Sequence, residues 1–497
     1  MSKPNIIFVF TDQHNGSVVH AMGDEYVRTP NMDHMARQGV SFENAYCASP
    51  LCVPSRSSML SGRMPHETKI FNNAQCLPSD RATFVHSLGA AGYETVLSGR
   101  MHFNGPDQRH GYEKRFVGDI TTAALGVTFS KARYGYFDNC AMPGRLSIEK
   151  SGKGRCAVMA FDRDVTDAAC GYLKNRKEER PLFLTVGLYG PHPPYVGPEE
   201  LYDYYYACLP ACSPLTREEL DRVHPFEKRF MEKRNIGYET EEELRRVRAA
   251  YYSMVEYEDS LLGELLSAAE ENLDMENTVV LYASDHGDCI GDHGLFWKSN
   301  LREGAVKVPM IFMWDQHIPR GRRIKTPVSL IDLAPTFIGL TGADPLPVMD
   351  GESLAPVLES GTEPDNPKPV ISEICDIKGD DPAAMIRRGR YKYCQYYGYE
   401  EPMLFDLEED PKEERNLSSL PEYAGIKEEL RVLLEQVWDE EKIYQERLLA
   451  EKDMAIRREW AKQQGAKLFY DEWQQTGRER NENYLITDKG IVSDEGE

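Results

Sequence analysis

Four short, largely apolar runs limit the folds open to this chain. They occupy residues 5–10, 93–98, 182–188 and 278–282 and are rich in β-branched and aromatic residues. Runs of this kind are typical of strands buried on both faces of a parallel sheet. Helical segments lie between them, and the clearest begins at a capping box formed by Thr240 and Glu243. The alternation predicts an α/β fold with a large, mostly parallel sheet sandwiched between helices.

Polar and titratable residues follow each run at its carboxyl end. In open α/β sheets, ligands bind at the edge where the carboxyl ends of the strands meet. The residues that follow the four runs, in chain order, are Asp12, Gln13, Arg100, His102, His192, Asp285 and His286. We therefore expect these side chains to converge on one site.

The first and last of these groups suggest a metal site. Asp12, Gln13, Asp285 and His286 offer carboxylate, amide and imidazole ligands, which suit Ca²⁺, Mg²⁺ or Mn²⁺ better than a thiolate zinc site. A single aspartate is more often a helix cap or a turn residue. Here two strand ends each carry a pair of residues that includes an aspartate, and this pattern favours a metal site over a cap or a turn.

The chain also carries cations that suit an anionic ligand. Its formal charge of −23 argues against nucleic acid as a partner, because phosphate binding needs a basic surface. Arg56, Arg100, His102, His192 and Lys298 supply the positive charge and proton donors that a tetrahedral anion requires. We expect this positive charge to be concentrated locally.

A cysteine motif adds a specific chemistry. Residues 52–56 read CVPSR and continue into the helix-compatible run SSMLSGR. By itself, Cys52 could be a buried small hydrophobe that precedes a helix. The spacing of Cys52, Pro54 and Arg56 nevertheless resembles the signature at which type I sulfatases have a cysteine oxidised to Cα-formylglycine.

Further motifs carry the same resemblance along nearly the whole chain. FTDQ at 10–13 and SDHGD at 284–288 resemble the two metal motifs of the formylglycine-dependent sulfatases of the alkaline phosphatase superfamily, and GLFWK at 294–298 resembles the segment with the sulfate-binding lysine. Residues 98–111 and 385–392 are more similar to choline sulfatases, in which Asn73 would match an active-site asparagine. Arg100 stands at a position where sulfatases usually have lysine. Gln13 and His286 stand where many sulfatases carry Asp and Asn, a variation that similar phosphonate monoester hydrolases and choline sulfatases share.

The resemblance implies a sulfuric ester hydrolase that releases sulfate from a small organic sulfate ester. It implies that a formylglycine-generating enzyme converts Cys52, and that a divalent metal, Ca²⁺ foremost and otherwise Mg²⁺ or Mn²⁺, assists. The implied metal ligands are Asp12, Gln13, Cys52, Asp285 and His286. The implied substrate-binding residues are Asn73, Arg100, His192 and Lys298. The implied catalytic residues are Cys52, Arg56, Arg100, His102, His192 and Lys298, with His192 protonating the leaving alcohol and His102 accepting a proton as sulfate leaves.

Two other functions stay open at this point. A phosphonate monoester or phosphodiester hydrolase of the same fold could use the same metal and formylglycine. A catalytically silent anion-binding protein would keep Cys52 unmodified.

The rest of the chain predicts a smaller second unit and a tail. Residues 366–439 contain short strand-like runs and a helical pattern of apolar residues from Ile426 to Val437, which predict an antiparallel sheet with a packed helix beside the catalytic domain of 1–365. Residues 440–497 are strongly charged and predict a helical tail through which the chain forms a homo-oligomer.

Cellular location is predicted from the cysteines and the apolar runs. The first residues lack the length and flanks of a secretion signal, and no apolar run approaches the roughly 20 residues that cross a bilayer. The 11 cysteines show no paired spacing, which is typical of free thiols in a reducing compartment. We expect a cytoplasmic protein without a membrane partner.

Overall fold

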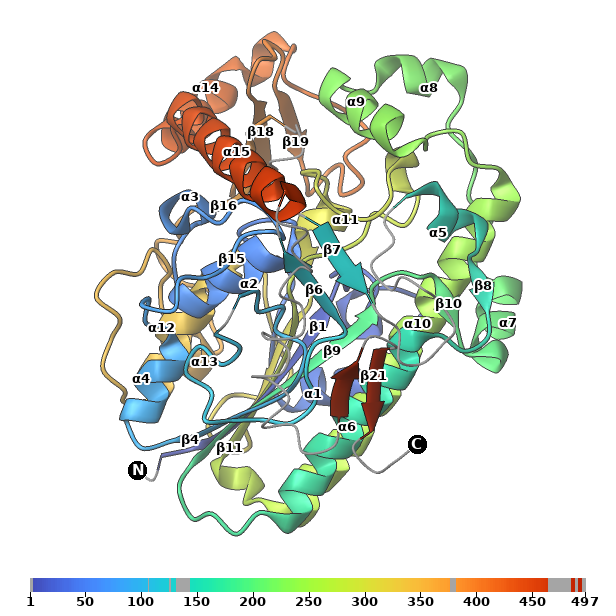
Figure 1. The fold of residues 1–497 in the computed structure, drawn as a ribbon. Helices are drawn as coiled ribbons and strands as arrows, with labels where there is room; N and C mark the ends of the chain where they lie inside the picture. The colour runs from blue at the N-terminus through green and yellow to red at the C-terminus, as the bar shows by residue number, and fades with distance from the viewer. Residues whose placement is uncertain are drawn as a thin grey trace.

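A computed structural model describes residues 3–105, 107–124, 127–130, 144–375, 381–463, 484–487 and 490–493 (Figure 1). Its centre is an eight-stranded sheet in the order β14-β2-β13-β11-β1-β9-β4-β5. The four runs predicted from the sequence form its middle strands, which are β1 (Asn5–Asp12), β4 (Glu94–Gly99), β9 (Leu182–Pro191) and β11 (Thr278–Ser284). These four strands run parallel to their neighbours within this group, so the predicted parallel core of the sheet is confirmed.

Four shorter strands extend the sheet at both edges. They are β2 (Val40–Phe42), β5 (Lys114–Arg115), β13 (Met310–Met313) and β14 (Arg322–Ile324). Strand β13 lies antiparallel to both β11 and β2, whereas β5 and β14 pair in parallel. The sheet is therefore mostly parallel with one reversed strand.

Helices cover both faces of the sheet because its strands are apolar on both faces. Ile7 and Val9 of β1 belong to one core, together with Val165 of α6 (Ala157–Asn175) and Leu262 of α10 (Glu241–Asn272). Phe8 belongs to the opposite core, to which α4 (Phe84–Ala90) and α12 (Leu333–Thr341) contribute. Figure 1 shows α6 and α10 on one side of the sheet and α4 and α12 on the other.

The longest helix starts where the sequence predicts. The Thr240 hydroxyl accepts a hydrogen bond from the Glu243 amide at 3.2 Å, and the Glu243 carboxylate accepts one from the Thr240 amide at 2.9 Å. This capping box satisfies amides that a helix start otherwise leaves without partners.

A separate four-stranded antiparallel sheet follows in the chain, as predicted. It contains β16 (Val370–Ile374), β17 (Ala383–Arg388), β18 (Tyr391–Tyr396) and β19 (Met403–Asp406). Helix α14 (Ala424–Glu435) packs against β17 and β18 and buries Leu430 and Leu434. The prediction that Val437 shares this buried face is wrong: the helix ends at Glu435, and Val437 is 52% exposed.

The tail begins with α15 (Glu440–Gln463), which lies near α14 in Figure 1. Residues 464–483, 488–489 and 494–497 of the predicted tail lie outside the described residues. Within the described part of the chain, no helix is long and apolar enough to span a membrane.

Further helices are α1 (Pro30–Gln38), α2 (Cys52–Ser61), α3 (Pro65–Thr68), α5 (Arg145–Glu149), α7 (Glu199–Cys208), α8 (Arg217–Arg222), α9 (Pro225–Arg234), α11 (Glu303–Val306) and α13 (Ala355–Ser360). Further short strands are β3 (Ala45–Tyr46), β6 (Thr121–Ala124), β7 (Val127–Ser130), β8 (Gly152–Lys153), β10 (Val196–Gly197), β12 (Lys307–Val308), β15 (Val328–Ser329), β20 (Tyr484–Thr487) and β21 (Gly490–Ser493).

Candidate active site

The site forms where the carboxyl ends of the middle strands meet the start of α2. Asp12 is the last residue of β1, Asp285 and His286 follow β11, and Cys52 is the first residue of α2. One ligand atom from each of these four side chains lies within 4.8 Å of the others, and all four residues are buried. The sequence prediction that these strand ends converge is therefore confirmed.

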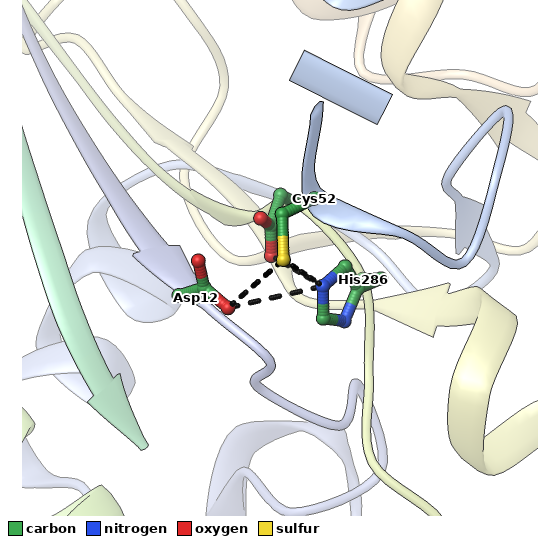
Figure 2. A group of neighbouring side chains, drawn as sticks. Asp12, Cys52 and His286 are labelled. Carbon is green, nitrogen blue, oxygen red and sulfur yellow. Dashed lines mark hydrogen bonds and ion pairs between the residues drawn. The ribbon is translucent and has the colours of Figure 1, made fainter. Parts of the chain in front are cut away.

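Figure 2 shows how three of these side chains face one another. The Sγ atom of Cys52 lies 3.2 Å from Nε2 of His286 and 3.8 Å from Oδ1 of Asp12. His286 Nε2 is also 3.8 Å from Asp12 Oδ1 and 3.5 Å from Asp285 Oδ1. Two carboxylates and an imidazole around one small volume form a donor set that suits a hard divalent cation.

Arg56 joins the two acidic strand ends. Its side chain donates hydrogen bonds to Asp285 at 2.8 Å and to Asp12 at 3.1 Å, and also to the Thr11 carbonyl oxygen at 3.2 Å. The side chain is only 1% exposed. Because charge-assisted hydrogen bonds are strong in a buried setting, Arg56 fixes the spacing between β1 and β11.

Arg100 approaches Asp12 from the end of β4. Its Nε donates to Asp12 Oδ2 at 2.5 Å, and its Nη1 donates to Asp119 at 2.7 Å. Burial alone would raise the pKa of Asp12, but the charges of Arg100 and Arg56 hold that pKa well below its ordinary value. Asp12 is therefore ionised, as a metal ligand needs to be.

His102 and His192 are both neutral in this environment. Burial and the positive charge of Arg100 lower the pKa of His102, and burial and Lys298 lower the pKa of His192. The Nδ1 atom of His192 lies 2.8 Å from the Pro193 carbonyl oxygen, which only accepts, so this nitrogen carries the ring proton.

The geometry of His102 sets the tautomer of its ring. Its Nδ1 lies 2.8 Å from Nη2 of Arg100, and a guanidinium only donates, so the neutral ring carries its proton on Nε2. The Nε2 atom is buried and has no hydrogen-bond partner among the described residues. In this tautomer the Nε2–H of His102 is a donor, and its role as proton acceptor when sulfate leaves stays a prediction.

Lys298 and Gln13 form a second group beside the cluster. The Lys298 ammonium donates to the Gln13 side-chain oxygen, and the Gln13 amide nitrogen donates to Asp288 at 2.6 Å. Both polar atoms of the Gln13 side chain are thus engaged by protein groups. The structure places Gln13 beside the four-residue cluster, with its amide oxygen turned to Lys298.

Asn73 contacts the start of α2. Its side-chain oxygen accepts from the Val53 amide at 2.9 Å, and its Nδ2 lies 3.7 Å from the Cys52 Sγ. Asn73 therefore satisfies a free amide at the helix start and faces the reactive position at the same time. The structure brings Asn73 into the site together with the strand-end residues.

Two buried carboxylates outside the predicted set of site residues hold the side chains and backbone of the site in position. Asp119 accepts from Arg100 and from the His102 amide at 2.8 Å, and Asp288 accepts from Gln13 and from the Trp297 amide at 2.8 Å. Asp119 follows no apolar run or motif, so the sequence gives no signal for it. Asp288 lies inside the SDHGD motif, where its position next to predicted ligands was the available signal.

Left-handed backbone conformations concentrate here. Gln13 has φ 72°, His102 has φ 56°, and Trp297 and Ser299, on either side of Lys298, have φ 61° and φ 64°. Such conformations cost about 1–3 kcal/mol each for residues other than glycine and persist where surrounding contacts enforce them. Their presence beside the clustered side chains supports a functional site.

The comparisons with known proteins agree with this geometry. The sequence model of the Sulfatase family matches residues 4–343, and a model described as N-sulphoglucosamine sulphohydrolase, C-terminal, matches residues 291–440. The choline-sulfatase of Rhizobium meliloti is 34% identical over 432 residues, which cover 84% of this chain and 83% of that protein. Arylsulfatase K of Danio rerio is 29% identical and covers 88% of this chain and 84% of its own.

Solved structures share the fold. The phosphonate monoester hydrolase of Agrobacterium radiobacter matches with a TM-score of 0.73 at 22% identity, covering 99% of this chain and 100% of that one. A protein solved in complex with its substrate D-glucosamine-2-N,6-O-disulfate matches with a TM-score of 0.71 at 23% identity, covering 89% and 98%. The strand-end cluster, the family model and the choline-sulfatase relative together lead to one conclusion: this chain belongs to the sulfatase family.

Proposed function

We propose that the protein hydrolyses the sulfate ester of a small organic molecule and releases inorganic sulfate, with Cys52 as the reactive position after conversion to formylglycine. The observation that carries this proposal is the position of Cys52. Its Sγ lies 3.2 Å from His286, 3.7 Å from Asn73 and 3.8 Å from Asp12, at the first residue of a buried helix. The helix start contributes partial positive charge to the site, which favours a bound anion.

The state of the thiol fits a modified side chain. Burial and the charge of Asp12 raise the pKa of the Cys52 thiol to about 11. The thiolate is the nucleophilic form of cysteine, so an unmodified Cys52 is a poor nucleophile at neutral pH. A hydrated formylglycine supplies two hydroxyl groups, one for attack on sulfur and one through which the sulfated intermediate collapses.

We propose that Asp12, Asp285, His286 and the modified Cys52 hold a divalent cation, with Ca²⁺ first and Mg²⁺ or Mn²⁺ as alternatives. The donor chemistry supports this proposal, because two carboxylates and one imidazole within 4.8 Å match the ligands of hard cations. Bound there, the cation would act as a Lewis acid that lowers the pKa of a nearby hydroxyl. Gln13 joins this set only if its amide oxygen leaves Lys298.

The cationic and donor side chains of the site have two roles: some hold the metal ligands in place, and others contact the substrate. Arg56 is committed to Asp12 and Asp285, so it holds the ligands in place. We assign Lys298 and the Nε2–H of His102 as donors to the oxygens of a sulfate group, because the Lys298 ammonium contacts a neutral amide and the Nε2 atom of His102 is buried without a partner among the described residues. Removing one preorganised donor to a developing negative charge costs roughly 10²–10³ in kcat in comparable sites.

We assign the general-acid role to His192. Its Nδ1 is fixed by the Pro193 carbonyl oxygen, which leaves Nε2 as the atom that takes up a proton. The pKa of this ring is low because of burial and Lys298, and a bound sulfate ester brings negative charge that raises it. Binding of substrate would therefore charge the ring before it donates to the departing alcohol.

The test combines mass spectrometry with turnover. The tryptic peptide from Gln38 to Arg56 of protein from its native host is expected to carry an aldehyde in place of the thiol. The same protein is expected to release sulfate from an aryl sulfate faster than phosphate or phosphonate from matched aryl esters, and Cys52→Ser is expected to lose multiple turnover. Faster phosphonate release would favour a phosphonate monoester hydrolase, and an intact thiol without turnover would favour a silent anion-binding protein.

The organisation outside the site remains part of the proposal. We propose a catalytic domain of 1–365, a C-terminal subdomain of 366–439 and a tail of 440–497 that forms the contact between copies of the chain. Exposed apolar side chains on α15 support the last point, because Leu449, Ile456 and Trp460 are 61%, 69% and 48% exposed. Sedimentation of a chain that ends after Asp439 tests it, and an oligomer unchanged by the truncation would contradict it.

The proposed cellular location is the cytoplasm. All ten cysteines in the described part of the chain are free. Free thiols are typical of proteins in a reducing compartment. Fractionation of native cells with an antibody to this protein tests the location, and recovery from an oxidising compartment would contradict it.

A further inference from the structure

Two buried carboxyl groups lie behind the end of β9, outside the cluster around Cys52. Asp162 belongs to α6 and Glu258 to α10, and both side chains are fully buried. The carboxylate of Asp162 accepts a hydrogen bond from the Tyr189 amide at 2.5 Å and another from the Gly190 amide at 2.7 Å. Asp162 thus binds the backbone amides two and three residues before His192.

Gly190 brings the second carboxyl into the same contact. A Cβ atom at this position would lie 2.1 Å from Oε1 of Glu258 and 3.1 Å from Oδ2 of Asp162. Only a residue without a side chain fits between the two carboxyls and the strand. Glycine at position 190 is therefore required for the pair to approach β9.

The two carboxyl groups need a proton between them. Both oxygens of Glu258 are buried, and neither has a hydrogen-bond donor among the described residues. Two ionised carboxylates side by side in a buried space repel each other, whereas a single shared proton gives one an O–H that donates to the other. The two amides of β9 already donate to Asp162, so Glu258 is the group that carries the proton.

The surrounding charges agree with this protonation. Burial raises the pKa of Asp162 to about 7, and burial with the charge of Asp162 raises the pKa of Glu258. Arg100, at the end of β4, is the cation that favours ionised Asp162. The other titratable groups that interact with the pair are Tyr257 on α10 and Tyr282 on β11, whose pKa values burial raises.

The segment held by the pair touches two residues of the site. The ring of Tyr189 lies 4.4 Å from the Arg100 guanidinium carbon and 4.7 Å from the ring centre of His192. The amide of this same tyrosine donates to Asp162. A shift of the β9 end would therefore move Tyr189 and, with it, both Arg100 and His192.

We propose that Asp162 and Glu258 share one proton and that this carboxyl–carboxylate pair positions the end of β9, and through Tyr189 the side chains of Arg100 and His192. The proposal rests on the proposed function, in which His192 protonates the leaving alcohol. Asp162 and Glu258 are positioning residues, since they lie behind the strand and act through it.

Three variants test the pair. Glu258→Gln keeps the shape and supplies an amide N–H that donates to Asp162, whereas Glu258→Met removes the donor and leaves a buried, uncompensated carboxylate. Asp259→Asn is the matched control: Asp259 is the next residue of α10 and is equally buried, but it binds the Asn31 and Met32 amides of α1. Each variant is made in the full chain and matured to the same formylglycine content.

The kinetic result distinguishes positioning from stability. Displacement of a catalytic group by about 1 Å can cost roughly 10²-fold, so we expect Glu258→Met to lower kcat by about 10- to 100-fold with little change in KM. Glu258→Gln is expected to retain kcat within about twofold, and Asp259→Asn to lose stability without loss of kcat. Equal kcat for Glu258→Met and the control would overturn the proposal.

Two measurements do not depend on turnover, so they separate this proposal from the proposed function. Amide hydrogen exchange at residues 189–190 is expected to accelerate in Glu258→Met and to stay slow in Glu258→Gln. A carboxyl whose folded pKa is raised gives a stability that falls as pH rises from its unfolded value toward its folded value. The Tm of the wild type relative to Glu258→Gln is therefore expected to fall as the pH rises above 4.5, the ordinary pKa of glutamate. Parallel Tm curves for these two proteins would show that no proton is shared.

Discussion

Replacing Lys392 with methionine is expected to destabilise the protein strongly, because this buried lysine of the antiparallel sheet pairs with two carboxylates, one of them on α11. Lys392 lies on β18 of the antiparallel sheet and is 0% exposed. Its ammonium lies 2.8 Å from Glu303, at the start of α11, and 2.8 Å from Glu413. Methionine has a similar length but no charge, so the variant keeps the packing, leaves Glu413 without this cation and leaves Glu303 with Arg387 as its ion-pair partner, at 3.6 Å.

Two arguments give a consistent magnitude. Removing one partner of a buried ion pair costs about 3–5 kcal/mol, because the remaining charge is left uncompensated. Burial alone would raise the pKa of Glu303, but Lys392 and Arg387 lower it from 4.5 to about 2. A shift of that size corresponds to about 3 kcal/mol, at 1.36 kcal/mol for each pKa unit. Lys392 is the largest lowering cause of this shift, and the loss of the contact with Glu413 adds to the part that Lys392 supplies. We therefore expect the variant to lose about 3–4 kcal/mol at pH 7.

The assay is thermal unfolding compared with a matched surface variant. At about 2.1 cal/mol/K per residue, the unfolding entropy of 497 residues is about 1 kcal/mol/K, so Tm is expected to fall by about 3–4 °C. Lys368→Met is the control, because Lys368 pairs with Glu352 where both side chains are more than half exposed, at 65% and 56%. Exposed pairs contribute about 0–1 kcal/mol.

The stability difference between the wild type and Lys392→Met is expected to depend on pH. A carboxylate with a depressed folded pKa contributes stability that is present above its unfolded pKa and is lost as pH falls through its folded pKa. The difference between wild type and Lys392→Met is therefore expected to be full above pH 4.5 and to shrink toward pH 2. A Tm loss no larger than that of Lys368→Met, or one that does not change with acid, would refute the reasoning.

Other predictions concern the site itself. Gly187→Ala would place a Cβ 1.9 Å from the Arg100 carbonyl oxygen, so we expect kcat/KM to fall by about 10- to 100-fold. Gly171→Ala in α6 is the control, because no atom lies within 4 Å of its Cβ, and we expect it to keep its activity and to gain up to about 1 kcal/mol in the free energy of unfolding. Steady-state kinetics and thermal unfolding check both variants. Asp288→Ala removes the acceptor that holds Gln13, so a loss of about 1–3 kcal/mol of transition-state stabilisation is expected in kcat/KM. Treatment with a chelator is expected to lower Tm, and added Ca²⁺ at about 100 times its Kd to restore about 2.7 kcal/mol; an unchanged Tm would contradict a metal at the cluster.

The sequence predicts the middle of the sheet but not its edges, for a physical reason. Strands such as β1 are buried on both faces, so their apolar runs are long enough to recognise. Strand β2 has three residues, and its partner β13 has four and lies about 270 positions further along the chain, where Phe312 pairs with Val40. Such short strands are defined by tertiary pairing, which local patterns do not contain.

The same distinction applies to the site. Asp12, Asp285 and His286 are predictable because they follow apolar runs whose ends meet at one edge of the sheet. Asp119 follows no such run, and its role appears only when the fold brings it to the backbone amide of His102. Residues that bind are marked by position on the sheet, whereas residues that orient them come from loops whose path depends on the whole fold.

The hydrogen-bond partners of the cationic side chains determine how much positive charge this acidic protein offers to an anion. Arg56 and Arg100 both bind Asp12, so much of their charge serves to hold the cluster at the strand ends. Lys298 instead donates to the neutral amide of Gln13, and that contact leaves its charge uncancelled. Loss of the Lys298 charge should therefore weaken substrate binding and transition-state stabilisation, whereas loss of Arg56 should disturb the proposed metal site and the fold. Positive charge at this site therefore either holds the acidic cluster together or binds the anion. Contact with a carboxylate marks the first role, and contact with a neutral amide marks the second.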